Sequence, residues 1–317
     1  MKKIVISTLL ATTLLLSNSS ANNSSINSTS KIVESYEKLA SQGEIEAMFN
    51  LGLIYLTGDG AKQDYTKAKE WFLKAANKND TMSAYNLALI YKNGLGVPKN
   101  DKEAYKYFLI AANKNYAQAQ YMLGNMIEKG QRAKKDLKEA FSWFLKAAKQ
   151  GHILSEYRVG KMYRLGEGVA KSDTEAKKWY ELSANKGNAF AQVNLGMMYK
   201  QGVATKQDYK EAFNWFEKSA NQKNILGQLN LALMYQNGLG VEKDLKEAFK
   251  LYQLASDEGN SSSAQYNLGL MYLKGDGIEK NIDKTIEYWT KSSEQGFEVA
   301  KNSLEKLCKE SSNSCKK

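Results

Sequence analysis

The sequence predicts an all-α fold: a right-handed α/α superhelical solenoid of seven helix pairs with a capping half-repeat at each end. Three observations predict it. A motif recurs about every 36 residues, its small and apolar residues follow helical spacing, and a glycine ends every copy. Such a period is typical of helical solenoids, because one helix pair cannot bury its apolar face alone and stacking supplies the partner. We call one equivalent residue of each motif position 0; these residues are Leu51, Leu87, Leu123, Val159, Leu195, Leu231 and Leu268.

The first helix of each unit combines small residues at positions −4 and +1 with a Tyr at +4 in six copies. Spacings of three and four residues put these side chains on one helical stripe. A glycine within a helix costs about 1 kcal/mol relative to alanine, so glycine at +1 predicts that a neighbouring helix approaches closely there. The +1 residues are Gly52, Ala88, Gly124, Gly160, Gly196, Ala232 and Gly269.

A glycine at +7 in every copy predicts the end of the first helix, because glycine adopts left-handed backbone without strain. The second helix is expected to begin with an N-cap residue, and in five copies a Glu three residues later predicts a reciprocal capping box. An aromatic pair such as Trp143-Phe144 then supplies most of the packing surface. The N-cap residues are Asp64, Asn100, Asp136, Ser172, Asp208, Asp244 and Asn281.

The two ends of the chain differ from the repeats. Two lysines, an apolar run and small residues before position 22 predict a secretory signal peptide at 1–21, cleaved after Ala21. A disordered Ser/Asn-rich linker is expected at 22–30, the solenoid at 31–310 and a C-terminal tail at 311–317. We therefore expect a periplasmic or secreted protein, with no membrane-spanning segment in the mature chain. In an oxidising compartment Cys308 and Cys315 are expected to form a disulfide; the alternative is two free or intermolecular thiols.

The phrases NLGLMYLKGDGIEKN and GLGVEKDLKEAFKLYQLA resemble the Sel1-like repeat family, which is related to the tetratricopeptide repeat. The resemblance extends from Ala47 to Gly296 and implies a scaffold that binds a protein or peptide. It also implies an alternative, because exported Sel1-like proteins of the Helicobacter cysteine-rich type are assigned as β-lactamases or penicillin-binding proteins. The cysteines that those relatives carry in each repeat are absent here.

Composition and motifs favour the scaffold over the enzyme. The net charge of +11 comes from scattered lysines rather than a basic cluster, so we expect no nucleic-acid partner. No cofactor, metal site or catalytic residue is expected, and the protein is expected to be a monomer. Three Ser-x-x-Lys strings occur, without the Ser-Asp-Asn and Lys-Thr-Gly motifs that accompany them in β-lactamases. They begin at Ser35, Ser183 and Ser303.

The candidate binding residues lie at positions −1 and −2 of the first helix, on the flank expected to face the inner groove of the superhelix. In related tetratricopeptide repeats an Asn before the position 0 residue binds the backbone of an extended peptide, and an amide can both donate and accept. The alternative is that the Asn side chains bond to a neighbouring helix and the tyrosines pack between repeats. The candidate residues are Asn50, Asn86, Asn194, Asn230 and Asn267, together with Tyr85, Tyr121, Tyr157 and Tyr266.

A modification site is the last candidate. Glu258-Gly259-Asn260-Ser261-Ser262 fits the extended acidic sequon of some bacterial N-glycosylation systems, in a loop that carries one extra residue. Asn260 is therefore a candidate glycosylation site, and an unmodified Ser-rich loop is the alternative.

Overall fold

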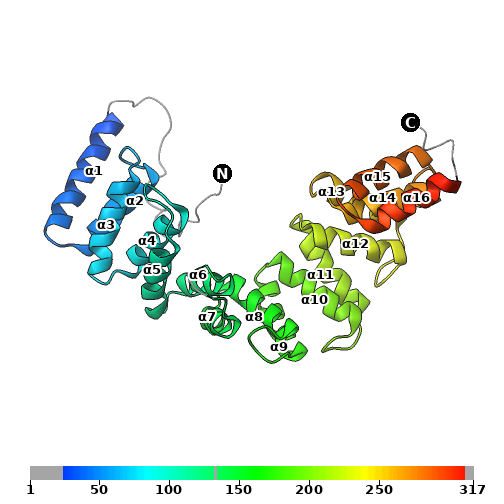
Figure 1. Ribbon diagram of the computed structural model, residues 1–317, viewed down its shortest axis with the longest axis horizontal. Coiled ribbons are helices and arrows are strands. Elements are labelled where there is room, and N and C mark those ends of the chain that lie inside the picture. Colours follow the sequence, from blue (N-terminus) through cyan, green and yellow to red (C-terminus); the bar gives the residue numbers. More distant parts are fainter. Residues whose placement is uncertain (1–23, 132–133, 311–317) are drawn as a thin grey trace. The chain divides into compact units, whose positions relative to one another are not determined.

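The structure is a computed structural model that describes residues 24–131 and 134–310 (Figure 1). The predicted signal peptide, Cys315 and the tail at 311–317 lie outside the described residues. The described part of the chain contains α-helices and turns but no β-strand. Its helices are α1 Ser24–Ser41, α2 Ile45–Thr57, α3 Tyr65–Asn77, α4 Thr81–Asn93, α5 Asp101–Asn113, α6 Ala117–Glu128, α7 Leu137–Lys149, α8 Ile153–Leu165, α9 Asp173–Asn185, α10 Ala189–Gln201, α11 Tyr209–Asn221, α12 Ile225–Asn237, α13 Leu245–Asp257, α14 Ser262–Lys274, α15 Ile282–Glu294 and α16 Glu298–Glu310.

These helices confirm the predicted solenoid of seven helix pairs. In each pair we call the first helix, which carries position 0, helix A and the second helix B; the pairs run from α2 and α3 to α14 and α15. The remaining helices, α1 and α16, pack against α2 and α15 at the two ends. Helix α1 begins at Ser24, within the segment 22–30 for which the sequence predicted a disordered linker. No Gly or Pro interrupts the residues between Ser24 and Ser41, so the helix has no breaker there.

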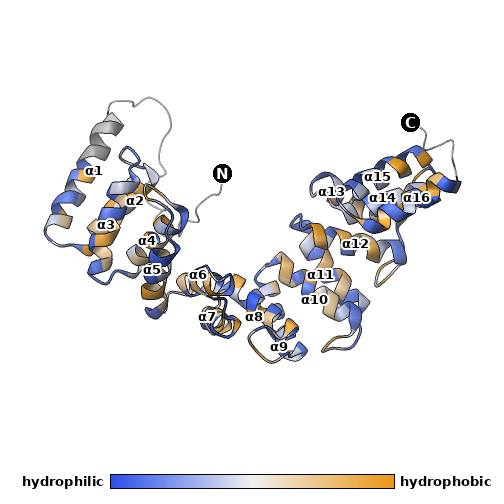
Figure 2. Cartoon of the chain, viewed as in Figure 1, coloured by the Kyte–Doolittle hydropathy of each residue, from blue (hydrophilic) through white to orange (hydrophobic). Residues whose placement is uncertain are grey.

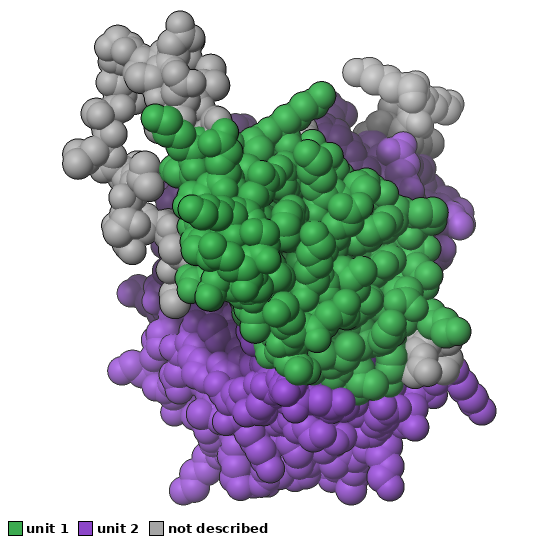
Figure 3. Space-filling view, turned by 90° about the vertical axis from the view of Figure 1, so that its left-hand side faces the viewer, with its two compact units in different colours: residues 1–111 green, residues 112–317 purple. Residues whose placement is uncertain are grey.

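The chain divides into two compact units, residues 1–111 and 112–317 (Figure 3). Helix α5 begins in the first unit and ends two residues into the second. Within each unit, consecutive helices pack against one another, and hydrophobic stretches occur in both helices of a pair, as in α10 and α11 (Figure 2).

The glycine at +1 of helix A receives an aromatic ring from helix B of the same pair, as the sequence predicted. A Cβ added to Gly196 would lie 2.7 Å from the ring of Phe216, and one added to Gly124 would lie 2.8 Å from Phe144. Both rings are fully buried. Because the glycine has no side chain, the ring packs directly on the backbone of helix A, which is the close approach that justifies glycine in a helix interior.

The predicted helix ends are also confirmed. Six helices A end at a left-handed glycine C-cap at +7, for example Gly202 with φ 69° and Gly238 with φ 65°. In the turn that follows, most repeats place a second glycine, such as Gly240 with φ 71°, whereas Ala204 occupies this position with φ 55°. A left-handed alanine is strained because its Cβ approaches the following carbonyl.

The N-caps of helix B are confirmed, but the reciprocal capping box is wrong. The side chain of Asp208 accepts a hydrogen bond from the backbone N–H of Glu211, as predicted. The N–H of Asp208 itself donates to the carbonyl of Tyr199 on helix A, 2.9 Å away, and not to the Glu211 side chain. Elsewhere the capping-box glutamates pair with lysines, as Glu175 does with Lys178. The N–H of the N-cap residue is therefore bonded to helix A, which takes the donor that the reciprocal capping box requires.

A polar side chain at position −3 of helix A bonds to the residue that ends helix B, a pairing the sequence analysis missed. Gln222 donates from Nε2 to Oε1 of Gln192 at 2.8 Å, and Gln192 donates to the carbonyl of Ala184 at 3.1 Å. Gln295 and Gln265 repeat this contact. In the fourth repeat the amides are replaced by the ion pair of Lys186 with the buried Glu156. This pairing could have been predicted from the constant spacing of 30 residues between the two polar residues of each pair.

We expect Gly196→Ala to destabilise the protein by about 1–3 kcal/mol, because the added methyl overpacks against Phe216. Chemical denaturation of the purified protein measures this. The matched control is Ala232→Gly, which makes the reverse change at the same position of the sixth repeat and should cost no more than about 1 kcal/mol through helix propensity. Equal effects of both variants would contradict the close-packing account.

We expect Ala204→Gly to raise the stability by about 1 kcal/mol, because glycine relieves the left-handed strain. The same denaturation experiment tests it. Gly240→Ala, the reverse change, should destabilise, since its Cβ would lie 2.3 Å from the carbonyl oxygen of Tyr209. A loss of stability in Ala204→Gly would show that the turn is not strained.

Candidate binding surface

One face of helix A in the second unit is accessible to solvent while the face beside it is buried. We call the residues at positions −5, −1, +2 and +6 the helix A stripe, because spacings of four, three and four residues keep them on one face. In α10 and α12 none of these residues is buried, whereas Leu195 and Leu231 at position 0 are. The stripe residues of these two helices are Phe190, Asn194, Met197 and Gln201 of α10, and Leu226, Asn230, Leu233 and Asn237 of α12.

The predicted Asn residues lie on this stripe, and those at 86, 194 and 230 use one of their two N–H donors within the helix. Asn194 donates from Nδ2 to the carbonyl of Phe190 at 2.8 Å, and Asn230 donates in the same way to Leu226. In the first unit, Asn86 donates to Met82 at 2.9 Å. Asn50 and Asn267 occupy the same position and are half-buried like the others. An amide side chain has a second N–H and a carbonyl oxygen with two lone pairs, so these groups can still bind a ligand.

The predicted Tyr residues contact aromatic rings of helix B or of the following helix A. Tyr85 is buried and its ring lies 5.7 Å from Phe108; Tyr121 lies 5.9 Å from Phe144. Tyr157 contacts both Tyr180 and Phe190, each at 6.1 Å. These distances are those of packed aromatic pairs. The tyrosine rings therefore pack on helix B of their own repeat, and the ring of Tyr157 also packs on the following helix A.

Tyr157 also connects neighbouring helices A through its hydroxyl. Burial raises the pKa of this hydroxyl, and Arg158 and a hydrogen bond with Asn194 oppose the shift. Tyr266 makes the corresponding links at the end of the second unit, where its ring lies 5.6 Å from Phe297. Through these contacts the tyrosines hold the Asn-bearing helices in register.

The exposed apolar side chains at position −5 of the stripe were not predicted from the sequence. At position −5, Leu154 of α8 is 44% exposed, Phe190 is 51% exposed and Leu226 is 49% exposed. They could have been found from their spacing, since each lies 36 residues from the next and four residues before the predicted Asn or its substitute Arg158. Exposed apolar side chains that recur in register mark an interaction surface more strongly than single ones.

Charges on the stripe have one sign. Among the described residues of α8, α10, α12 and α14, the charged stripe positions are held by Arg158, Lys161 and Lys274. Glu128 of α6 forms an ion pair with Arg158. The stripe thus presents basic and apolar groups together, without an exposed carboxylate.

The single histidine caps helix α8 beside the stripe. The Nδ1 atom of His152 accepts from the backbone N–H of Ser155 at 3.3 Å, and Nε2 lies 2.8 Å from Oε1 of Gln118. Because a carbonyl oxygen only accepts, Nε2 carries the hydrogen and Nδ1 is the acceptor. Burial lowers the pKa of this imidazole, so the neutral form that caps the helix is favoured.

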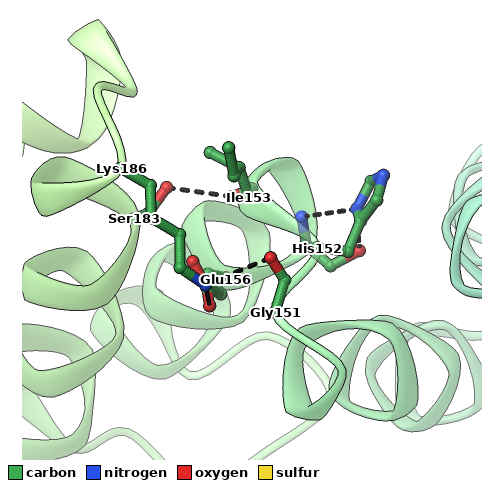
Figure 4. Close-up of polar contacts among 7 residues, drawn as sticks. Gly151, His152, Ile153, Glu156, Ser183 and Lys186 are labelled. Carbon is green, nitrogen blue, oxygen red and sulfur yellow. Dashed lines mark hydrogen bonds and ion pairs between the residues drawn. The ribbon is translucent and has the colours of Figure 1, made fainter. Parts of the chain in front are cut away.

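In the Ser-x-x-Lys string that begins at Ser183, the serine and the lysine bond to other groups and not to each other. Ser183 is fully buried and donates from Oγ to the carbonyl of Ile153 at 2.9 Å, while Lys186 pairs with Glu156 and bonds to the carbonyl of Gly151 (Figure 4). Ser303 lies 3.5 Å from the hydroxyl of Tyr266. A catalytic serine needs a base within hydrogen-bonding distance; Ser183 and Lys186 instead tie helix B to helix A.

The other candidate positions are placed as follows. Asn260 is exposed with φ 45°, and its Oδ1 accepts from Nε2 of Gln265 at 3.0 Å. Cys308 lies in α16.

Within the described ranges, no group of three or more His, Cys, Asp or Glu side chains could hold a metal ion. None of the helices in that part of the chain is both long and apolar enough to cross a membrane.

This architecture of helix pairs with a free face on helix A defines a helical repeat scaffold. Seven consecutive segments match the Sel1 repeat, at residues 45–80, 81–116, 117–152, 153–188, 189–224, 225–260 and 262–297. The chain belongs to the Sel1 repeat family.

Solved structures agree with this assignment. The chain is similar to c5321, a protective antigen of uropathogenic Escherichia coli with 35% identity and a TM-score of 0.80, over 87% of this chain and 59% of that one. It thus spans less than two thirds of that protein. A Sel1 repeat protein from Oxalobacter formigenes is 27% identical over 89% of this chain and 81% of its own, with a TM-score of 0.71. No curated protein matches the chain in sequence.

We expect the stability to fall as the pH is lowered, with His152 as one cause. Its folded-state pKa is depressed, so its contribution is fully present above the ordinary value of about 6.5 and is lost as the pH falls through the folded-state pKa. The loss should approach about 1 kcal/mol, the contribution of an N-cap. His152→Asn, which matches the caps Asn188 and Asn224, should abolish this part of the pH dependence in thermal melts between pH 5 and pH 8; an unchanged profile would exclude His152.

Proposed function

We propose that this protein is an exported scaffold that binds a protein or peptide partner through the helix A stripe. Sel1 repeats generally mediate protein–protein interaction, and the observation that supports this particular surface is the recurrence of accessible amide and apolar side chains in register. Helix A is held by its opposite face, where the position 0 residues and the aromatic rings of helix B pack. A ligand could therefore occupy the stripe without disturbing the core.

The amides suit recognition of a peptide backbone. Each Asn keeps its acceptor oxygen after bonding to its own helix, and Asn230 also keeps one N–H, whereas Asn194 bonds to the hydroxyl of Tyr157 as well. A peptide group offers the complementary donor and acceptor, so a row of Asn side chains would bind main chain largely independently of sequence. The neighbouring apolar groups at position −5 would then add contacts to side chains of the ligand.

Export, covalent modification and oligomeric state complete the proposal. The segment 1–21 would direct the chain to the periplasm or beyond, where Cys308 and Cys315 would close a disulfide at the end of the last helix. The protein would act as a monomer. Asn260 is exposed in the loop before α14, which suits a glycan there.

We expect the double variant Asn194→Ala, Asn230→Ala to lose its partner with only a small fall in its melting temperature. The Nδ2 bonds to the helix are accessible to solvent and alanine favours the helix, so the main loss is the contact of Asn194 with the Tyr157 hydroxyl, which should cost about 1 kcal/mol. The measurement is crosslinking in the native compartment followed by mass spectrometry, with melting followed in parallel. The control is Gln192→Ala, which breaks the buried amide pair, should cost about 1–3 kcal/mol, and should still capture the partner below its melting temperature.

The binding proposal fails if the double variant captures the same partner as the unchanged protein. A large fall in its melting temperature would instead make the Asn residues structural. Hydrolysis of nitrocefin by the purified protein, above a heat-killed control, would contradict the scaffold proposal. It would favour the alternative that the sequence leaves open, which is a β-lactamase or a protein that binds penicillin or cell-wall material.

A further inference from the structure

One repeat lacks the polar contact that ties the end of helix B to helix A. Position +27, the first residue after helix B, carries a hydrogen-bond donor in six repeats and Glu258 in the sixth. In the fifth and seventh repeats this donor bonds to the side chain at −3, Gln222 to Gln192 at 2.8 Å and Gln295 to Gln265 at 2.7 Å. The six donors are Lys78, Lys114, Gln150, Lys186, Gln222 and Gln295.

Glu258 leaves a buried acceptor without a donor. Gln228, at −3 of the sixth repeat, is 3% exposed, and its Oε1 atom has no hydrogen bond in the described structure. An ionised carboxylate only accepts hydrogen bonds, so Glu258 does not supply the missing donor. It lies 3.3 Å from Nζ of the exposed Lys223. An exposed ion pair contributes little and an unsatisfied buried acceptor is costly, so packing does not account for an acidic residue here.

The loop that follows α13 is accessible at the residues that matter for modification. Residues 258–261 connect α13 to α14, one residue more than the segment 222–224 that connects α11 to α12. Glu258 and Asn260 are exposed. The Oδ1 atom of Asn260 accepts from Nε2 of Gln265 at 3.0 Å. This bond uses the oxygen, so it does not engage Nδ2, the atom that carries an N-linked glycan.

The missing contact also makes this loop easier to open. In the fifth repeat, Gln222 ties the turn to the buried Gln192, and the turn after Glu258 lacks that tie. A segment held by fewer buried bonds opens locally at lower free energy. Opening is needed, because Asn260 has a left-handed φ of 45° and Ser262 begins α14, whereas a modifying enzyme must reach both residues together.

We propose that Glu258 is the recognition residue of an N-glycosylation site, and that the exported chain carries an oligosaccharide on Nδ2 of Asn260. A residue that breaks a structural rule without a gain in packing is expected where function requires it. Glu258, Asn260 and Ser262 are the acidic, acceptor and hydroxyl residues of the extended sequon. The inference rests on the export in the proposed function, and it assigns the cost at Gln228 to recognition by a glycosyltransferase.

The donor of the sugar is a lipid-linked oligosaccharide pyrophosphate. A bond forms between Nδ2 of Asn260 and the first carbon of the sugar, and the bond from that carbon to the pyrophosphate oxygen breaks. The lipid pyrophosphate leaves with the electron pair, and the amide gives up one proton to solvent.

Intact-mass measurement of the protein purified from its native host tests the site. The unchanged protein should carry an addition to the mass of residues 22–317, which Asn260→Gln and Ser262→Ala should abolish. Glu258→Gln should lose most of the addition, and Glu258→Asp should keep it. Ser263→Ala is the matched control in α14 and should leave it unchanged. An unmodified protein, or an addition that persists in Asn260→Gln or Glu258→Gln, overturns the inference.

The stability of Glu258→Gln separates recognition from a structural role. The new amide can donate to Oε1 of Gln228, as Gln222 does to Gln192, so the midpoint of chemical denaturation should rise while the glycan is lost. Both proteins are compared in the Asn260→Gln background, which removes the effect of the glycan itself. The reverse change in the fifth repeat, Gln222→Glu, should lower the midpoint and keep the glycan. A lower midpoint for Glu258→Gln would make Glu258 structural and contradict the inference.

The inference and the proposed function can fail separately. A mass equal to residues 22–317 alone overturns the glycan and leaves export standing. A mass that still includes residues 1–21 overturns export, and the glycan with it. Partner capture by the Asn194 and Asn230 variants tests the binding surface independently of either mass.

Discussion

The rest of the structure depends on the contact between an aromatic ring of helix B and the glycine or alanine at +1 of helix A. Full burial of one such side chain stabilises the fold by about 3 kcal/mol, whereas an exposed ion pair such as Lys284–Glu287 contributes about 0–1 kcal/mol. The ring contact therefore dominates the packing of each pair. It also fixes which face of helix A is buried. The opposite face is left accessible, and the helix A stripe follows from this constraint.

Bonds between polar side chains then fix the position of helix B against helix A, which the ring contact alone does not determine. The amide pair of Gln192 and Gln222 and the ion pair of Glu156 and Lys186 occupy the same place in successive repeats. A buried polar group must form a hydrogen bond. Because a neutral pair in one repeat is replaced by a charged pair in another, this place requires a matched donor and acceptor and does not require a charge. The sixth repeat differs, because Oε1 of the buried Gln228 has no partner in the described structure. This is the repeat that precedes the loop with the extra residue.

The repeated helix pairs could be predicted from the sequence because their determinants are local. Glycine at +7 and Asp or Ser at the N-cap act within one turn, and glycine at +1 has a cost that only a close neighbour explains. The capping box failed because the competing acceptor, the Tyr199 carbonyl, comes from another helix. The candidate Asn positions were visible as a spacing, but their bonds to the preceding turn were not. The positions of Phe190 and Leu226 were visible as a spacing of 36 residues, but their exposure was not, since an apolar residue at helical spacing is ordinarily part of a core.

The central claim is that one face of helix A holds the fold and the other binds a partner. Site-specific photocrosslinking in the native compartment tests this directly, with a photoreactive amino acid placed either at Asn194 on helix A or at Leu182 on helix B. Both positions are accessible, so the two proteins differ only in the face that carries the probe. The account predicts a discrete crosslinked partner from position 194 and none from position 182. The same partner captured only from position 182 would contradict it.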